Sequence, residues 1–584
     1  MDRRRFEGRS LTGRLWQWRL SDKTPTATAP PSQLSPLVSR LLAGRGITAD
    51  EASHFLNPRL RDTLPPPARF ADMEQAASRI CAAISDSAAV ALLADSDADG
   101  SSAAALMYRY LRALGCDVRV CVPDRFRDGY GPNESLIKEL IADGCGLLIT
   151  LDCGTTAHDP LALAQKSGID VIVCDHHLPD ASLPDVHSVV NPCRRDDESG
   201  QQTLTGVGVA FMLALAVNLR LRDTEGRAPE SLPDPLKLTD LVALGTVCDM
   251  GELRGLNRAF VYQGLRNLRR GGNLGMTALR RRLGGDDGWS AETLGFYVGP
   301  CINAGARMGE GELAHRLLIE EDEVQARDLA ARLYEHNCER REREAMVLRA
   351  AVSAAEAGDL SEGVLVVSGD DWHRGVLGIV AGRLARRFHL PSVVLSAGDD
   401  GLLHGSGRSV AGLDLGSAVL EARSAGLLES GGGHAMAVGL SLKRAMVDEF
   451  REFLSSRFRG EVVALEAARV LELDDILLPA AVGDGVMGEV ERLHPYGVGN
   501  PEPCFAVEGL VVERSWEIRG GGYGVKFRDS LGTRLRGVSF RSAGTNLGMA
   551  LLDEGGRALD VAVRLRREEY GVGLVLEDIR WSGG

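Results

Sequence analysis

The stretch Val171-Ile-Val-Cys-Asp-His-His177 decides how this sequence is read, because an apolar run ends in three adjacent side chains with oxygen and nitrogen ligands. A short apolar run bounded by polar residues is typical of a buried β-strand. Open α/β sheets bind their ligands at the carboxyl ends of such strands. The triplet alone does not establish a site, since paired histidines also occur on solvated turns and as hydrogen-bonded core residues.

Three other segments repeat the pattern of an apolar run followed by aspartate. We expect strands at 89–94, 146–151 and 241–248, and the acidic side chains that follow them are Asp95, Asp97 and Asp99, then Asp152, then Asp249. Aspartates this close together repel one another at neutral pH unless a cation neutralises them. An EF-hand loop starting at Asp95 is excluded, because its closing position requires a bidentate glutamate and holds Leu106 instead. Oxygen ligands with one imidazole suit Mn²⁺ or Mg²⁺ and disfavour zinc.

These four acidic segments resemble, in order and spacing, the four motifs of the DHH phosphoesterase superfamily. Further motifs narrow the resemblance to the RecJ family of bacterial 5′-to-3′ exonucleases specific for single-stranded DNA, and they lie at 302–307, 372–383, 405–409, 431–434 and 495–503. The chain departs from this family in having Ala94-Asp95-Ser96 for Gly-Asp-Tyr, Met250-Gly251-Glu252 for Val-Val-Pro, and Cys301 for arginine. None of these departures removes an expected ligand.

The resemblance implies a centre of two divalent metal ions, Mn²⁺ or Mg²⁺, about 3.5–4 Å apart. The implied metal ligands are Asp95, Asp97, Asp99, Asp152, His176 and Asp249, with Asp152 bridging the two ions. All of these except Asp95 are implied to be catalytic, together with His177, which would contact the scissile phosphate or assist the leaving oxygen. Asp175 is implied to orient a neighbouring imidazole.

The resemblance also implies a pocket for the terminal 5′-phosphate of DNA. Its expected residues are Arg125, Arg307, Ser406 and Arg408, with His434 as a further substrate contact. We expect the glycine-rich segments 405–409 and 431–434 to be tight turns, whose backbone N–H groups could hold phosphate oxygens.

The predicted fold class is α/β with several domains. Alternating strands and helices predict a mostly parallel sheet, and a proline-free run rich in Glu, Arg and Ala predicts a long connecting helix. The end of the chain reads only as β-rich, and its assignment as an OB-like nucleic-acid-binding domain comes from the resemblance. The expected parts are an N-terminal cap (1–70), a DHH catalytic domain (71–319), a helical connector (320–358), a smaller α/β DHH-associated domain (359–460) and the OB-like domain (461–584).

The composition is that of a globular protein, with 44% hydrophobic residues in 584. No apolar run approaches the length of a membrane span, and no apolar region of a signal peptide follows the basic start, so we expect a cytoplasmic protein. Eleven cysteines without a Cys-x-x-Cys pair indicate reduced thiols. The net charge of −14 opposes binding to a phosphate backbone, but such binding is decided by local patches of charge.

The resemblance implies a monomer that degrades single-stranded DNA in recombination and repair, beside a helicase and the single-strand-binding protein. Three alternatives remain open. The chain could be an oligoribonucleotide or cyclic-dinucleotide phosphodiesterase with the same motifs, a non-catalytic DNA-binding scaffold, or an α/β protein whose acids only cap helices and form turns. The complete set of ligand side chains favours an enzyme over a scaffold.

Overall fold

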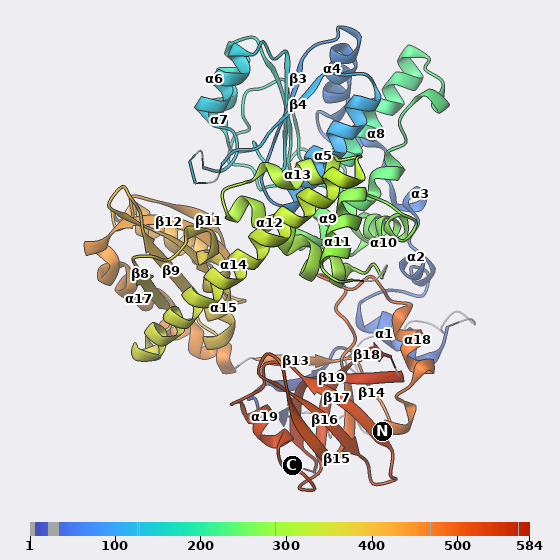
Figure 1. Cartoon of the computed structure of the whole chain (residues 1–584), viewed down its shortest axis with the longest axis vertical. Helices are drawn as coiled ribbons and strands as arrows, with labels where there is room; N and C mark the ends of the chain where they lie inside the picture. Colours follow the sequence, from blue (N-terminus) through green and yellow to red (C-terminus); the bar gives the residue numbers. More distant parts are fainter. Residues whose placement is uncertain are drawn as a thin grey trace. The chain divides into compact units, whose positions relative to one another are not determined.

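The computed structural model of the chain describes residues 6, 8–20, 34–124, 126–127, 129–285, 288–467, 469–569 and 571–583. Two compact units divide the chain (Figure 1). The first unit joins Met1–Arg59 to Leu465–Gly584, and the second unit is Leu60–Ala464. Because the first unit combines both ends of the sequence, the N-terminal segment packs with the β-rich end of the chain.

The second unit contains a five-stranded sheet in the order β4-β3-β5-β6-β7, and every pair of neighbours in it is parallel. Its strands are β3 (Val90–Ala94), β4 (Val118–Cys121), β5 (Leu147–Leu151), β6 (Asp170–Cys174) and β7 (Ser188–Val190). Ala94 pairs with Leu151, and Leu151 pairs with Cys174. The residues that follow these three strands therefore meet at one edge of the sheet, as the apolar runs predicted.

Helices cover both faces of this sheet (Figure 1). One face packs against α4 (Met73–Ser85), α5 (Ala98–Ala113) and α8 (Gly206–Glu225), and the opposite face packs against α6 (Glu134–Ala142) and α7 (His158–Lys166). The strands are apolar at nearly every position because both of their faces are buried.

The expected strand at 241–248 is wrong, because this segment is the helix α9 (Thr239–Cys248). All residues from Thr239 to Thr246 are buried, so the helix shows no polar face. A helix that is apolar on all sides has the same composition as a buried strand, and its length of only ten residues does not separate the two. Helix α9 packs against α5, α8, α10 (Gly255–Arg269), the 3-10 helix η4 (Pro235–Leu238) and the π-helix η5 (Thr293–Val298). The other helices of this region are α3 (Leu60–Thr63), which packs on α10, and α11 (Leu274–Arg282), α12 (Gly299–Arg307) and α13 (Glu312–Ile319).

The predicted long connector is the helix α14 (Glu323–Ala357), which packs against α11 and α12 at one end and α15 at the other. It leads into a second sheet with the strand order β11-β12-β10-β9-β8. The elements of this smaller domain are β8 (Leu365–Gly369), α15 (Leu377–Phe388), β9 (Ser392–Ala397), β10 (Leu402–Arg408), α16 (Leu415–Ser424), β11 (Ser430–His434), β12 (Ala437–Lys443) and α17 (Val447–Ala467).

The glycine-rich segments of this domain are strands, which corrects the prediction of tight turns. A Cβ atom on Gly405 would lie 2.4 Å from Leu395 Cδ2, and one on Gly407 would lie 2.6 Å from Val438 Cγ2. These glycines therefore allow close packing by neighbouring side chains within a sheet.

The first unit contains a six-stranded sheet that curls so that β15 pairs with both β16 and β18, consistent with the expected OB-like domain. Its strands are β14 (Asp475–Ile476), β15 (Phe505–Ile518), β16 (Gly522–Arg528), β17 (Arg534–Ser539), β18 (Leu559–Glu568) and β19 (Gly571–Trp581), and its helices are α1 (Pro36–Gly44), α2 (Ala52–Leu56), α18 (Asp484–Glu491) and α19 (Asn546–Leu551). A smaller sheet joins β1 (Gly8–Arg9) and β2 (Leu15–Trp18) to β13 (Val470–Leu473).

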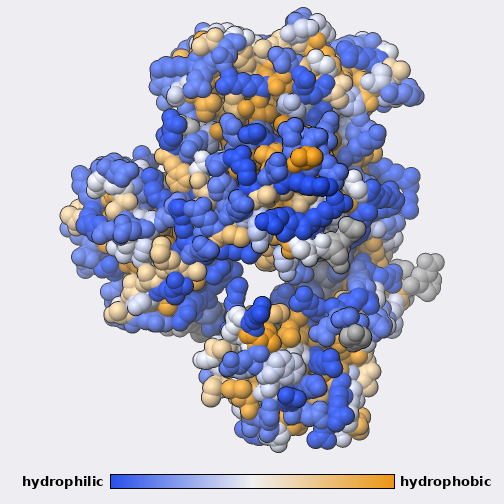
Figure 2. All heavy atoms as spheres, in the orientation of Figure 1, coloured by the Kyte–Doolittle hydropathy of each residue, from blue (hydrophilic) through white to orange (hydrophobic). Residues whose placement is uncertain are grey.

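Hydrophilic residues predominate on the face of the molecule drawn in Figure 2, with smaller apolar areas between them. Among the described residues, no helix has both the length and the apolar character needed to cross a membrane. All eleven cysteines are free thiols, as the sequence predicted.

Candidate metal centre

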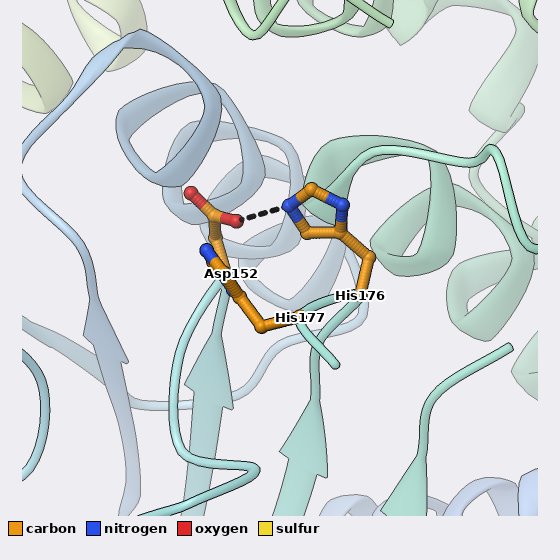
Figure 3. A group of neighbouring side chains, drawn as sticks. All are labelled: Asp152, His176 and His177. Carbon is orange, nitrogen blue, oxygen red and sulfur yellow. Dashed lines mark ion pairs between the residues drawn. The ribbon is translucent and has the colours of Figure 1, made fainter. Parts of the chain in front are cut away.

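The Asp-His-His triplet directly follows β6, and hydrogen bonds within the triplet fix the directions of its three side chains. Asp175 is buried, and its Oδ1 accepts hydrogen bonds from the backbone N–H groups of His176 at 2.7 Å and His177 at 3.2 Å. The same oxygen lies 2.7 Å from His177 Nδ1. His177 is therefore held by Asp175, whereas His176 faces the Asp152 carboxylate (Figure 3).

Two aspartates are positioned by the start of α5. Asp97 is the N-cap of this helix, because its Oδ1 accepts hydrogen bonds from Asp99 N at 3.0 Å and Gly100 N at 3.1 Å. Asp99 is buried, and its carboxylate accepts hydrogen bonds from the first two N–H groups of α8, Gly206 N at 2.6 Å and Val207 N at 3.1 Å. A helix N-terminus favours negative charge, which explains how this carboxylate tolerates burial.

All six expected metal ligands come together in three overlapping groups. Within each group the candidate ligand atoms lie within 4.8 Å of one another, and the groups are Asp95–Asp97–Asp152, Asp99–His176–Asp249 and Asp152–His176–His177. His176 Nε2 lies 3.0 Å from Asp152 Oδ1, 3.7 Å from Asp249 Oδ2 and 3.9 Å from Asp99 Oδ2. Asp152 and His176 each belong to two groups, which is the arrangement expected where two ions share ligands.

The protein alone does not neutralise the acids of this centre. Burial and repulsion from Asp249 and Asp97 raise the pKa of Asp99 well above its usual range, and burial with repulsion from Asp99 does the same to the pKa of Asp152. Burial and the charge of Asp97 raise the pKa of Asp249 to about 7. A bound cation would remove this repulsion by holding all three groups ionised.

The two histidines differ in charge because their surroundings differ. Burial and the charge of His177 lower the pKa of His176 to about 4, so its ring is neutral at neutral pH and Nε2 can bind a metal. Burial disfavours the charged form of His177 too, but its hydrogen bond and ion pair with Asp175 raise its pKa to about 9. His177 is therefore a cation at the edge of the acidic centre.

The donor set of the centre fits a divalent cation. Asp152 Oδ1 and His176 Nε2 are buried and have no hydrogen-bond partner, although the two atoms are only 3.0 Å apart. Buried polar atoms are normally hydrogen-bonded, so two orphaned ligand atoms that face one another indicate that a ligand completes the site. Carboxylate oxygens with one imidazole fit Mn²⁺ or Mg²⁺.

Several residues of this centre escaped the sequence analysis. Asn191 Nδ2 donates to His177 O at 2.8 Å and to Thr155 Oγ1 at 2.9 Å, and Thr155 N donates to Asp175 Oδ2 at 3.0 Å. Asn191 directly follows β7, so the rule that polar residues follow strand ends could have found it. Tyr130, which lies beside Asp152 and His177, carries no such signal, because it comes from a loop.

Three of the expected phosphate-binding residues lie around the turn that precedes α15. Arg307 ends α12, and its Nη1 lies 3.3 Å from Gly375 O. Ser406 and Arg408 share one face of β10, and a Cβ on Gly378 would lie 3.1 Å from Arg408 Nη2 and 3.6 Å from Ser406 Cβ. Gly378, at the start of α15, thus makes room for the side chains of Ser406 and Arg408, whereas Gly375 lets the main-chain oxygen of Arg307 approach closely.

Of the remaining two expected substrate residues, His434 lies within the described part of the chain. His434 on β11 pairs with Ala437, which pairs in turn with Arg408, so His434 and Arg408 lie two strands apart on the same face of the sheet. Arg125 lies outside the described residues.

Comparison with known proteins places this geometry in a family. Three family models match the chain in order: the DHH family N-terminal domain at 89–246, the DHHA1 domain at 361–460 and the RecJ OB domain at 473–572. The single-stranded-DNA-specific exonuclease RecJ of Dickeya dadantii is 36% identical over 496 residues, which cover 83% of this chain and 85% of that protein. The protein of the same name from Bacillus subtilis is 35% identical over 82% of this chain, and the match spans 59% of the Bacillus protein.

Solved structures agree with these sequence matches. The crystal structure of Thermus thermophilus RecJ in complex with Mn²⁺ matches with a TM-score of 0.77 and 28% identity, covering 94% of this chain and 77% of that one. The structure of the same protein with Mg²⁺ matches with a TM-score of 0.72 and 27% identity, over 94% and 76% of the two chains. From its motifs, its domain order and its fold, the chain belongs to the RecJ family of DHH phosphoesterases.

Proposed function

We propose that this protein is a metal-dependent exonuclease that degrades single-stranded DNA from its 5′ end to 5′-mononucleotides. The observation that carries the proposal is the pair of buried, unpartnered ligand atoms on Asp152 and His176 within a cluster of mutually repelling carboxylates. RecJ proteins that share its domain order are exonucleases specific for single-stranded DNA, which supports the same activity here.

The metal ligands in this proposal are Asp95, Asp97, Asp99, Asp152, His176 and Asp249, and they would hold two Mn²⁺ or Mg²⁺ ions. RecJ of Thermus thermophilus binds both of these metals, which supports the assignment. When bound, such ions supply a water of lowered pKa as the nucleophile and stabilise the charge that develops on the phosphate. Asp99 and Asp152 are buried, and close packing around them limits how far their side chains can move.

His177 acts in this proposal as the protein's own cation beside the scissile phosphate. Its Nδ1 is engaged by Asp175, and its protonated Nε2 lies 3.4 Å from the Tyr130 hydroxyl, a long contact that leaves Nε2–H able to reach a phosphate oxygen or give a proton to the leaving 3′ oxygen. Asp175 keeps this ring oriented and charged.

The 5′-to-3′ direction would follow from recognition of the terminal phosphate by Arg125, Arg307, Ser406 and Arg408, with His434 as an outer contact. The support is that Ser406 and Arg408 share one strand face and that Arg307 contacts the turn leading to α15. Guanidinium groups bind phosphate oxygens in pairs, which suits recognition of a terminal phosphate with its additional charge.

The OB-like domain offers a second surface for the strand. An open pocket of about 500 Å³ on β15, β16 and β17 is lined by Arg514, Lys526, Arg534 and Arg536, with Glu513 and Leu535. Positive charge of this kind attracts the phosphates of single-stranded DNA despite the net charge of −14. We further propose that the protein works as a monomer in the cytoplasm, in recombination and repair, beside a helicase and the single-strand-binding protein.

The test follows single-stranded DNA labelled at either its 5′ or its 3′ end, with Mn²⁺ or with EDTA. We expect early release of labelled mononucleotide from the 5′ label only, abolished by EDTA and by Asp152→Asn. The matched control is Asp223→Asn, which alters an exposed carboxylate paired with Arg222 and should leave the activity unchanged. Binding without cleavage under all metal conditions would favour the scaffold, and exclusive cleavage of dinucleotides would favour the small-substrate phosphodiesterase.

A further inference from the structure

Tyr130 lies outside the proposed ligand set but contacts one of its members, Asp152, and also His177. It belongs to the loop between β4 and α6, and it is flanked by Gly129 and Gly131 in left-handed backbone conformations. Its hydroxyl oxygen lies 3.2 Å from the main-chain oxygen of Asp152, 3.4 Å from His177 Nε2 and 3.5 Å from His177 Nδ1. Its ring meets that of His177 edge-on, with the centroids 6.0 Å apart.

The donors in this cluster can be assigned by elimination. A main-chain oxygen can only accept, so the Tyr130 hydroxyl donates its proton to Asp152 O. His177 Nδ1 lies 2.7 Å from Asp175 Oδ1, which also can only accept, so Nδ1–H is used there. The nitrogen left to face the Tyr130 oxygen is Nε2. The hydroxyl therefore links the backbone of Asp152 to the ring of His177.

The Asp152 backbone needs such a partner because it is strained. Asp152 has a φ of 59°, in the left-handed region that residues other than glycine rarely occupy, at a cost on the order of 1–3 kcal/mol. This conformation turns its carboxylate toward His176 Nε2. The Tyr130 hydroxyl donates to the carbonyl oxygen of Asp152 and so restrains the peptide plane that follows this residue. If that plane turned, the Asp152 carboxylate would leave the cluster.

From these contacts we propose that Tyr130 is a positioning residue for hydrolysis, and that its hydroxyl holds the Asp152 backbone and the His177 ring in their working orientations. This inference rests on the proposed function, because it assigns a role to a residue beside the same centre. This positioning role depends on the hydroxyl group of Tyr130. The competing role, in which the half-exposed ring stacks on a base of the DNA, belongs to the ring.

Substitution separates these two roles. Tyr130→Phe keeps the ring and removes the hydroxyl, whereas Tyr130→Leu removes both. We expect Tyr130→Phe to lower kcat about tenfold, with KM and the melting temperature unchanged, because one hydrogen bond to the centre is lost. Tyr262→Phe is the matched control, since that tyrosine lies away from the centre and its ring contacts Arg266. A base-stacking role predicts instead that Tyr130→Phe retains full activity and that Tyr130→Leu raises KM.

A double-mutant cycle with His177→Ala tests whether Tyr130 acts through its neighbours. If the hydroxyl positions His177, Tyr130→Phe should lower kcat by a clearly smaller factor in the His177→Ala background than in the wild type. Equal factors in both backgrounds, or an unchanged kcat in Tyr130→Phe, would overturn the proposal. If the wild-type protein showed no metal-dependent cleavage, the proposed function itself would be refuted. That result would be known from the wild type alone, before any variant is compared.

Discussion

Gly245 in α9 gives the sharpest test of how the centre is built, because its lack of a side chain makes room for a proposed ligand. A Cβ atom at this position would lie 2.4 Å from Asp99 Oδ1 and 2.7 Å from Val207 Cγ1. Ordinary contacts of this kind are about 1 Å longer. Asp99 cannot withdraw without lengthening its hydrogen bonds to Gly206 N and Val207 N. Gly245→Ala should therefore displace the carboxylate or push α8 away from α9.

The expected loss of stability and of kcat in Gly245→Ala can be worked out from these contacts. Overpacking costs about 1–3 kcal/mol, which outweighs the gain of up to about 1 kcal/mol that alanine brings to a helix. A ligand displaced by close to 1 Å should cost about 100-fold in kcat. We therefore expect Gly245→Ala to lose about two orders of magnitude of Mn²⁺-dependent cleavage and to require more Mn²⁺ for half-maximal activity.

The assay compares initial rates on 5′-labelled single-stranded DNA over a series of Mn²⁺ concentrations, together with thermal unfolding. Gly460→Ala is the matched control, because Gly460 lies in α17 with no atom within 4 Å of an added Cβ. That substitution should keep full activity and stabilise the fold slightly. If Gly245→Ala kept its rate and its Mn²⁺ requirement within about threefold of the wild type, the geometric argument would be refuted.

Three further predictions follow from the charges of the described residues. The metal-free protein should lose stability as the pH rises from about 4 to about 7, because the raised pKa values of Asp99, Asp152 and Asp249 let the folded state hold protons that the unfolded state has released. These three carboxyl groups outnumber His176 and His315, whose lowered pKa values act in the opposite direction, and saturating Mn²⁺ should abolish the loss in urea unfolding at several pH values. Arg408→Lys should raise KM about tenfold for DNA with a 5′-phosphate but not with a 5′-hydroxyl, and equal effects on both substrates would contradict the phosphate pocket. Arg45→Ala should destabilise the first unit by about 3 kcal/mol in chemical unfolding, because the buried Asp474 keeps Arg19 but loses its closer ion-pair partner at 2.8 Å, and Asn500 Oδ1 loses its donor; a loss below about 1 kcal/mol would contradict this.

The sequence predicted the fold best where a segment is uniform in character. The runs that became β3, β5 and β6 are apolar at nearly every position, and the acids that follow them could be assigned to one sheet edge without coordinates. The same reasoning failed at α9, because complete burial removes the polar face that identifies a helix. The prediction of tight turns was also wrong at β10 and β11, because glycine there gives neighbouring side chains room within a sheet.

The sequence predicted which side chains cluster at the sheet edge but not the geometry of the cluster. Motif spacing indicated which carboxylates and histidines would meet, since adjacent parallel strands carry their ends to one edge. No pattern could indicate that the α8 N-terminus supports Asp99, or that Tyr130 from a distant loop bonds to the Asp152 backbone. Such contacts join segments far apart in the sequence, and they depend on the packing of the whole unit.

The small sheet that pairs β2 with β13 has a consequence for how the protein is made. Leu15 pairs with Val470, and Leu11 N donates to Ile579 O, so these first residues need partners that leave the ribosome hundreds of residues later. At about 5–20 residues per second, they wait roughly 20–115 s after their own synthesis. During this time the apolar Trp16 and Trp18, buried in the finished unit, are exposed as a nascent segment that chaperones can bind. Leu60–Ala464 can fold meanwhile, so the metal centre can form before the two ends of the chain meet.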